Sequence, residues 1–359
     1  MRRRLLFAAI SLALAVVAGV FASCAPAASR DDLARAGATR TTSSGSPLDG
    51  IGYVPANAPS ATLRPRPADA PDLVIIAFSG HCGLVCDTRS TWSYLSNASD
   101  STGGVAVLDA IAAAYTRLGL AKIEVFSASS FATSHYSSIS GKIEPGYLQA
   151  QAYLDEVKRD WIDGIDDPTR VVLVGHSHGT VWASLLAMNN LDVTFDSFVS
   201  LDAVCWMWWN KHKQYVKETF VDGPWTIPFP LEQGDPCGTL DVPGQTERQN
   251  INDVVPANVI YGLEVRTTFR LFSLDPNVLT DDHVNVRING THTNIWGITA
   301  TESHSDLGKH YNRSVSWVVA MLDSLGIPDH SAYPMSAFVL PEPPEGFTYF
   351  GGELTPLAP

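Results

Sequence analysis

The residues with the clearest chemical potential are Gly175-His176-Ser177-His178-Gly179, a serine that has a glycine two positions away on either side. The apolar run 171–174 precedes this segment, and 180–188 has the composition of a helix. A sharp strand-to-helix turn strains the backbone of the serine, and flanking glycines keep other side chains away from it. The pattern predicts that Ser177 is a nucleophile at the end of a strand. The backbone N–H of His178 would then point towards a developing oxyanion, assisted by the helix dipole.

A serine hydroxyl is a weak nucleophile, so it needs a base within hydrogen-bond reach and a carboxylate that fixes the tautomer of that base. His304 is the candidate base, because it lies late in the chain in the polar stretch 303–306, just before a predicted helix. The competing histidines are His283, His292 and His310. His176 and His178 are too close to Ser177 in sequence to fold back onto it, so they are predicted to shape the pocket.

Asp202 is the candidate acid, because it directly follows the strand-like stretch 195–201. It has an alternative role as a structural cap beside the site. An acid one strand later would instead be Asp275, Asp281 or Asp282.

A second oxyanion donor is expected in the loop after the first buried strand, where Ser79-Gly80-His81-Cys82-Gly83 combines small residues. Small residues let backbone N–H groups approach a substrate closely, so Gly80 and His81 are the predicted donors. An ordinary glycine turn is the alternative.

The elements that must position these residues alternate between strands and helices. The predicted strands are 73–78, 122–127, 171–174, 195–201 and 265–272, and the predicted helices are 105–118, 147–162, 180–188 and 311–325. Continuous apolar strands alternating with helices indicate a mostly parallel sheet covered on both faces, an α/β fold.

These motifs resemble the α/β-hydrolase superfamily, and more narrowly its bacterial lipase- and esterase-like members. The resemblance extends over 72–325 and depends on the serine turn, on Ser-Leu-Asp at 200–202 and on Ser-His-Ser-Asp at 303–306. The order of nucleophile, acid and histidine in that family is met by Ser177, Asp202 and His304. The resemblance implies a cofactor-free serine hydrolase that cleaves carboxylic esters of a small-molecule or lipid substrate.

The first residues have the layout of a secretory signal, with Arg2–Arg4 followed by an apolar stretch to about Phe21. Phe21-Ala22-Ser23-Cys24 resembles a bacterial lipobox, although that pattern usually has Leu in the first position. We therefore expect a signal peptide over 1–23 and lipidation of Cys24. An uncleaved membrane anchor is the alternative.

The domain plan continues with a tether over 24–68, rich in Ala, Ser, Thr, Gly and Pro. A hydrolase domain over 69–330 follows, with an insertion at about 205–260, and a Pro-rich tail covers 331–359. The expected location is the cell envelope, on the periplasmic or extracellular side, with the membrane contacted through the lipid anchor.

Four cysteines lie beyond Cys24, and an oxidising compartment would favour disulfides between Cys82 and Cys86 and between Cys205 and Cys237. A zinc site is the alternative, but the cysteines do not form paired CxxC units. The tryptophan-rich stretch after Cys205 allows two interpretations, a lid over an apolar acyl group or a local core pinned by a disulfide.

Charge excludes one class of partner. The 359 residues contain 37 acidic and 24 basic side chains and have a formal net charge of −13, which argues against nucleic acid because phosphate contacts need clustered Lys and Arg. Asp281, Asp282 and His283 fit no metal-ligand motif, so no catalytic metal is predicted.

Alternative functions remain. Ser177, His304 and Asp202 would also serve a thioesterase, an amidase or a phospholipase, and a surface lipoprotein that only binds its ligand is a further alternative.

Overall fold

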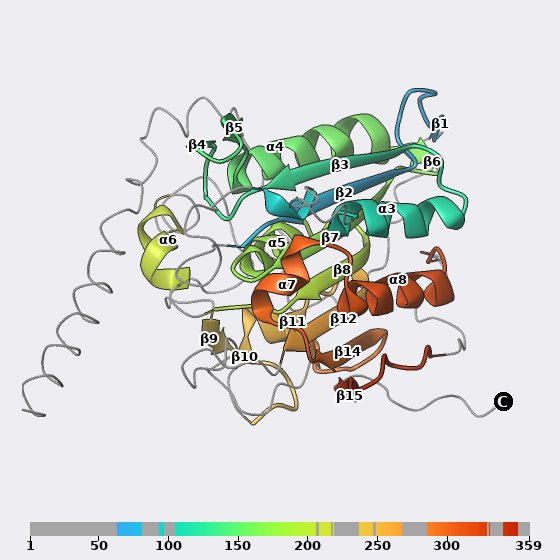
Figure 1. The fold of residues 1–359 in the computed structure, drawn as a ribbon. Coiled ribbons are helices and arrows are strands. Elements are labelled where there is room, and N and C mark those ends of the chain that lie inside the picture. Colours follow the sequence, from blue (N-terminus) through green and yellow to red (C-terminus); the bar gives the residue numbers. More distant parts are fainter. Residues whose placement is uncertain are drawn as a thin grey trace, which may run out of the picture.

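The computed structural model describes residues 63–80, 93–96, 105–205, 208–216, 218, 237–246, 249–267, 286–328, 330 and 340–350. Within these residues a seven-stranded sheet has the order β15-β14-β12-β8-β7-β2-β3 (Figure 1). Its strands are β2 (Leu73–Phe78), β3 (Ile123–Ala128), β7 (Arg170–His176), β8 (Phe195–Leu201), β12 (Val259–Thr267), β14 (Ile295–Ala300) and β15 (Thr348–Phe350). All neighbouring pairs are parallel except β14 and β15. The predicted α/β fold, a mostly parallel sheet with helices on both faces, is confirmed.

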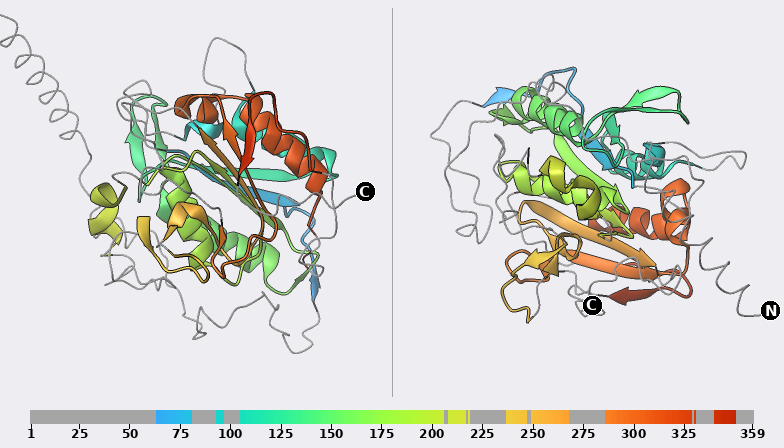
Figure 2. Two further views of the ribbon diagram at one scale, coloured as in Figure 1. Left: turned by 90° about the horizontal axis from the view of Figure 1, so that it is seen from below. Right: turned by 90° about the vertical axis from the view of Figure 1, so that its left-hand side faces the viewer.

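Helices cover both faces of the sheet, which is why β2 is apolar at every position. Along β2, Val74 and Ile76 belong to one core and Leu73 and Ile75 to the other. The helices of the first core are α4 (Tyr147–Val157), α5 (Gly179–Asn189) and α6 (Trp208–Val216), and those of the second are α3 (Val107–Arg117), α7 (His304–Lys309) and α8 (Arg313–Leu325). The sheet thus separates α4 and α5 from α3 and α8 (Figure 2).

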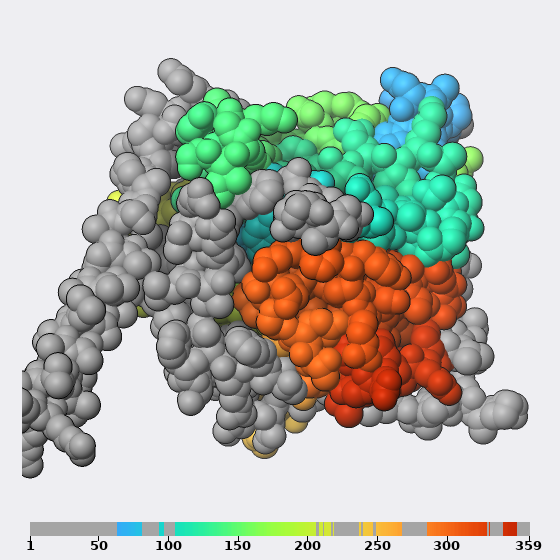
Figure 3. All heavy atoms as spheres, viewed as in Figure 1, coloured from blue at the N-terminus to red at the C-terminus, as the bar shows by residue number. Residues whose placement is uncertain are grey.

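Segments far apart in the sequence meet on the second face. The C-terminal segment with α7 and α8 lies against the earlier segment with α3 (Figure 3), and Arg117 of α3 forms an ion pair of 2.7 Å with Asp323 of α8. Both side chains are substantially exposed, so this pair contributes little to stability and the buried apolar faces of the helices hold them together.

The chain reverses its direction of travel across the sheet between β2 and β7. From β2 it moves outward to β3, and it then returns to the other side of β2 to form β7. The connection after β2 leads to α3 on one face, whereas the connection after β7 leads to α5 on the opposite face. The carboxyl ends of strands at such a switch point are where open α/β sheets bind ligands.

Several elements differ from the sequence predictions. The strand predicted at 265–272 starts earlier, at Val259, and in the described part of the chain it reaches Thr267. β14 is absent from the predicted strands, because Gly297 interrupts a short apolar run and lowers its strand propensity. β15, an edge strand within the stretch predicted as a Pro-rich tail, is also absent from them. The long helix predicted at 147–162 is α-helical to Val157 and continues as one π-turn over Lys158–Ile162.

Short elements surround the sheet. These are β1 (Arg64–Pro65) with β6 (Ile165–Asp166), β4 (His135–Ser137) with β5 (Lys142–Glu144), β9 (Cys237–Leu240) with β10 (Gln249–Asn250), β11 (Val254–Val255) with β13 (Val286–Arg287), and the 3-10 helices η2 (Tyr94–Ser96) and η6 (Ile251–Asp253).

The segment between β8 and β12 is tied to the core by the predicted Cys205–Cys237 disulfide. Trp208 is fully buried, with its ring 4.8 Å from that of Trp182 on α5. The local-core interpretation therefore holds for Trp208. The other predicted pair, Cys82–Cys86, lies outside the described residues, as do the signal, the lipobox and most of the tether.

The described segments contain no helix that is long and apolar enough to span a bilayer.

We predict that removal of this disulfide destabilises the fold. The bond joins residues 32 positions apart, so its loss restores considerable freedom to the unfolded chain. The double variant Cys205→Ala/Cys237→Ala is expected to lose about 3 kcal/mol of unfolding free energy, measured by urea denaturation without reductant. An unchanged midpoint would contradict the prediction.

Candidate active site

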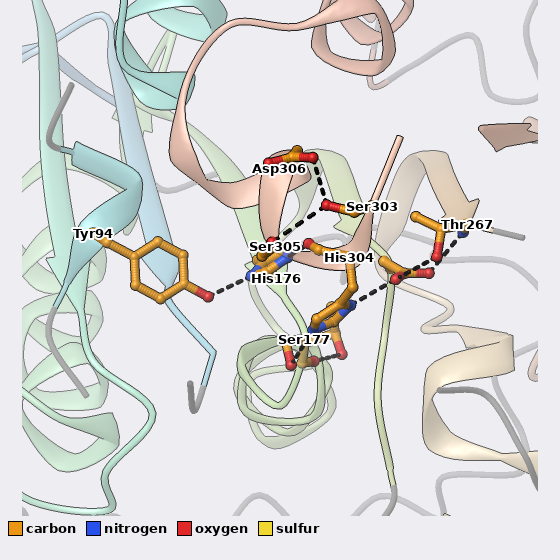
Figure 4. Close-up of polar contacts among 10 residues, drawn as sticks. Tyr94, His176, Ser177, Thr267, Ser303, His304, Ser305 and Asp306 are labelled. Carbon is orange, nitrogen blue, oxygen red and sulfur yellow. Dashed lines mark hydrogen bonds and ion pairs between the residues drawn. The ribbon is translucent and has the colours of Figure 1, made fainter. Parts of the chain in front are cut away.

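The carboxyl ends of the parallel strands meet at one edge of the sheet, and each is followed by a polar or small residue. Gly80 follows β2, Ser177 follows β7, Asp202 follows β8, Thr267 ends β12 and His304 follows β14. Because parallel strands bring these ends to one edge, residues spread over most of the domain become neighbours there. Figure 4 shows the polar contacts of Ser177, Thr267 and His304.

Ser177 occupies a tight turn between β7 and α5. Its backbone has a φ of +56°, the left-handed region that non-glycine residues rarely adopt. Local hydrogen bonds hold this conformation. The Ser177 N–H donates to the carbonyl of Leu201 at 3.1 Å, and the Ser177 carbonyl accepts from the hydroxyl of Thr180 at 2.6 Å. Asn252 Oδ1 of η6 lies 3.0 Å from that hydroxyl and shares its single proton, so the segment between β8 and β12 helps to support the turn.

Glycines are required around this turn because backbones approach one another closely. A Cβ on Gly179 would lie 2.1 Å from the carbonyl oxygen of Phe78, and a Cβ on Gly80 would lie 2.4 Å from the Cβ of Ser177. The ends of β2 and β7 therefore pack together without intervening side chains, and Ser177 is held directly against the turn after β2.

His304 joins Ser177 to Asp202. Its Nε2 lies 2.9 Å from Ser177 Oγ, and its Nδ1 lies 2.6 Å from Asp202 Oδ2. His304 is the first residue of α7, with Ser303 as the N-cap, rather than part of a loop before a helix. With Nδ1–H donated to the carboxylate, the unprotonated Nε2 faces the serine hydroxyl and accepts from it.

Asp202 is almost completely buried and accepts several hydrogen bonds. Thr267 donates its backbone N–H at 2.7 Å and its hydroxyl at 3.0 Å, in addition to the bond from His304. Burial alone would raise the pKa of this carboxyl, but the hydrogen bonds from His304 and Thr267 and the charge of His304 together lower it. Asp202 is consequently held ionised beside the imidazole.

The other predicted oxyanion donors and candidate bases lie at different positions in the structure. The N–H of Gly80, a predicted oxyanion donor, donates to the hydroxyl of Tyr94 at 2.8 Å. His178 is buried at the N-terminus of α5. His310 is the C-cap of α7, and His292 lies between β13 and β14. Outside the described residues lie His81, Asp275, Asp281, Asp282 and His283.

His176 lies between the site and the core. Its ring stacks on that of His304 with centroids 4.8 Å apart, and burial, followed by the charge of His304, lowers its pKa to about 3. It therefore stays neutral. The described residues contain no group of three or more His, Cys, Asp or Glu side chains that could hold a metal ion.

Sequence reasoning missed Thr267 and Tyr94. Thr267 ends a strand whose bounds were predicted too late, and Tyr94 lies in a short 3-10 helix that has no apolar period. The position of Thr267 at the end of a predicted strand could have indicated its role. A strand parallel to β8 and next to it ends near the carboxylate of Asp202.

No family model and no curated protein matches the chain. Among solved structures it is similar to the esterase domain of a Rhodothermus marinus protein, with 12% identity over 73% of this chain and 88% of the other and a TM-score of 0.32. It is also similar to Est1E from Butyrivibrio proteoclasticus, with 12% identity, coverage of 72% and 89% and a TM-score of 0.31. A third is the Vlm2 thioesterase domain, with 14% identity, coverage of 75% and 100% and a TM-score of 0.34.

We predict that the strain at Ser177 is released by glycine. Ser177→Gly and Ser177→Ala both remove the hydroxyl, but only glycine adopts a φ of +56° without steric cost. Ser177→Gly is expected to be about 1 kcal/mol more stable than Ser177→Ala in urea denaturation. Equal stabilities would contradict the interpretation of strain.

We predict that the stabilisation by Asp202 is lost in acid. The pKa of Asp202 in the folded chain is below the ordinary value of 3.8, so the ionised group stabilises the fold above that pH and ceases to do so as the pH falls through the folded pKa. Asp202→Asn is expected to cost about 2 kcal/mol near neutral pH, with a smaller difference from the wild type below about pH 4. Urea denaturation across this pH range measures the difference, and a gap independent of pH would contradict the prediction.

Proposed function

We propose that this chain is a serine hydrolase that cleaves carboxylic esters through an acyl-enzyme. The observation that carries the proposal is the continuous hydrogen-bonded series Asp202–His304–Ser177, in which the serine occupies a strained turn at the end of β7. Nucleophilic catalysis by serine needs this combination of hydroxyl, base and orienting carboxylate.

In the proposed reaction, Ser177 Oγ attacks the ester carbonyl carbon while His304 Nε2 takes the hydroxyl proton. Asp202 stays ionised and stabilises the resulting imidazolium through Nδ1–H. When the tetrahedral intermediate collapses, the bond to the alkoxy group breaks and His304 transfers its proton to the departing alcohol. Water then attacks the acyl-enzyme with His304 again as base, which releases the acid and restores Ser177.

Backbone N–H groups stabilise the oxyanion in this scheme. His178 supplies one from the N-terminus of α5, where the helix dipole also favours negative charge. Because the N–H of Gly80 is committed to Tyr94, the second donor is assigned to the next residue, His81.

We further propose that the enzyme acts in the cell envelope as a lipoprotein anchored through Cys24, on a small-molecule or lipid ester. The sequence pattern of residues 1–24 supports export, and the Cys205–Cys237 disulfide is in keeping with an oxidising compartment. Thioesters, amides and phospholipids remain alternative substrates for the same three residues, and binding without turnover is the alternative to catalysis.

We predict that purified full-length protein reacts covalently with a fluorophosphonate probe at Ser177. Labelling should disappear in Ser177→Ala and fall by a factor of about 10³ or more in His304→Gln, because the hydroxyl loses its base. Gel fluorescence and mass spectrometry of the labelled peptide provide the measurement.

Ser184→Ala is the matched control, since this buried serine lies on α5 away from the His304 contact. Its labelling should equal that of the wild type. Absence of labelling in well-folded wild type would reject the proposed reaction and favour the binding alternative. After labelling, a panel of short- to long-chain acyl esters, thioesters and amides distinguishes the substrate classes.

A further inference from the structure

A second series of hydrogen bonds reaches His304 from the side of η2. The N–H of Gly80 donates to the hydroxyl of Tyr94 at 2.8 Å, and that hydroxyl is hydrogen-bonded to His176 Nδ1. His176 Nε2 lies 2.9 Å from the backbone carbonyl oxygen of His304 (Figure 4). The series thus links the turns after β2 and β7 to the first residue of α7.

The two ends of this series fix the direction of every bond in it. A backbone N–H only donates and a carbonyl only accepts. His176 therefore carries its proton on Nε2 and donates it to His304, which leaves Nδ1 to accept from the Tyr94 hydroxyl. That hydroxyl accepts from Gly80 and donates to His176, so one arrangement of protons satisfies all four groups.

His176 is also suited to contact a base that becomes charged. Its burial keeps it neutral, with a pKa lowered to about 3, so it does not repel the imidazolium that would form on His304. Its ring lies nearly parallel to that of His304, with an interplanar angle of 28°, and limits rotation of the base.

Packing around the series leaves no room for other side chains. A Cβ on Gly308 of α7 would lie 2.6 Å from Tyr94 Cε2 and 2.9 Å from His176 Nδ1. A Cβ on Gly80 would lie 2.9 Å from the Tyr94 hydroxyl oxygen. Helix α7 consequently rests directly on Tyr94 and His176.

We propose that Tyr94 and His176 are positioning residues that hold the start of α7, and with it His304, in hydrogen-bond reach of Ser177. This inference rests on the proposed function, because it assigns the source of His304 alignment in the same reaction. α7 has only six residues, and the His304 side chain is 22% exposed, so contacts outside the helix must orient it. Asp202 holds Nδ1 of the ring, and His176 holds the backbone that carries it.

Tyr94→Phe tests the proposal by removing one oxygen. We expect kcat on an activated ester and the rate of fluorophosphonate labelling to fall about tenfold, while KM changes less than twofold. Tyr115→Phe is the matched control, because Tyr115 is also buried and donates to Ser197 at 3.0 Å near the start of β8, away from the site. It should lose comparable stability but retain wild-type kcat. Wild-type kcat in Tyr94→Phe would overturn the proposal.

Substitutions of His176 separate hydrogen bonding from packing. Gln retains an N–H that can reach the His304 carbonyl but lacks a ring, whereas Phe retains a ring but no donor. We expect His176→Gln to keep more of the wild-type kcat than His176→Phe at unchanged KM. The reverse order would assign His176 a packing role and overturn the proposal.

An NMR readout keeps the proposal testable even without catalysis. The Nδ1–H signal of His304, assigned by its loss in His304→Gln, should be sharp in the wild type and Tyr115→Phe but broadened in Tyr94→Phe. If the wild type fails to label, the proposed function fails while this comparison still tests the positioning. An identical His304 signal in Tyr94→Phe would overturn it.

Discussion

The close approach of the ends of β2 and β7 is the constraint on which the site depends. Only glycine fits at Gly179, where a Cβ would meet the carbonyl of Phe78, and at Gly80, where a Cβ would meet Ser177. This approach keeps Ser177 in the left-handed region and lets α5 start immediately after it. Burial of apolar side chains in the two cores, which hold β2 and β7 between helices, offsets the free-energy cost of the strained turn.

Two buried side chains contact His304, and one of them is ionised whereas the other is neutral. Asp202 is ionised because the hydrogen bonds from His304 and Thr267 outweigh the cost of its burial. His176 is neutral because burial and the charge of His304 lower its pKa more than the His304 carbonyl and the charge of Asp202 raise it. One group therefore stabilises positive charge on the base and the other orients it without adding charge, a division that suits an imidazole cycling between neutral and charged forms.

The segment between β8 and β12 reinforces this edge of the domain from outside the central strands. Cys205 lies just after Asp202, and the disulfide to Cys237 anchors that segment beside the acid. η6 of the same segment reaches the serine turn through Asn252 and Thr180. On the other side of β14, Thr348–Phe350 add β15 and cover an otherwise open strand edge.

Local sequence is sufficient to predict the serine turn, most of the helices and the α/β class. Those features follow from side-chain periodicity and from sterics within a few residues, as in Val171–Gly179. The partners of Ser177 depend on strand order and register, which sequence spacing does not encode. Register places Thr267 beside Asp202 and so favours this acid, and the path of η2 turns the Gly80 N–H towards Tyr94. Contacts across more than a hundred residues, such as those of His304 with Ser177 and with Asp202, exist only once the sheet has assembled. The local sequence around each residue does not determine which histidine or aspartate will lie beside Ser177, because that depends on the order of the strands.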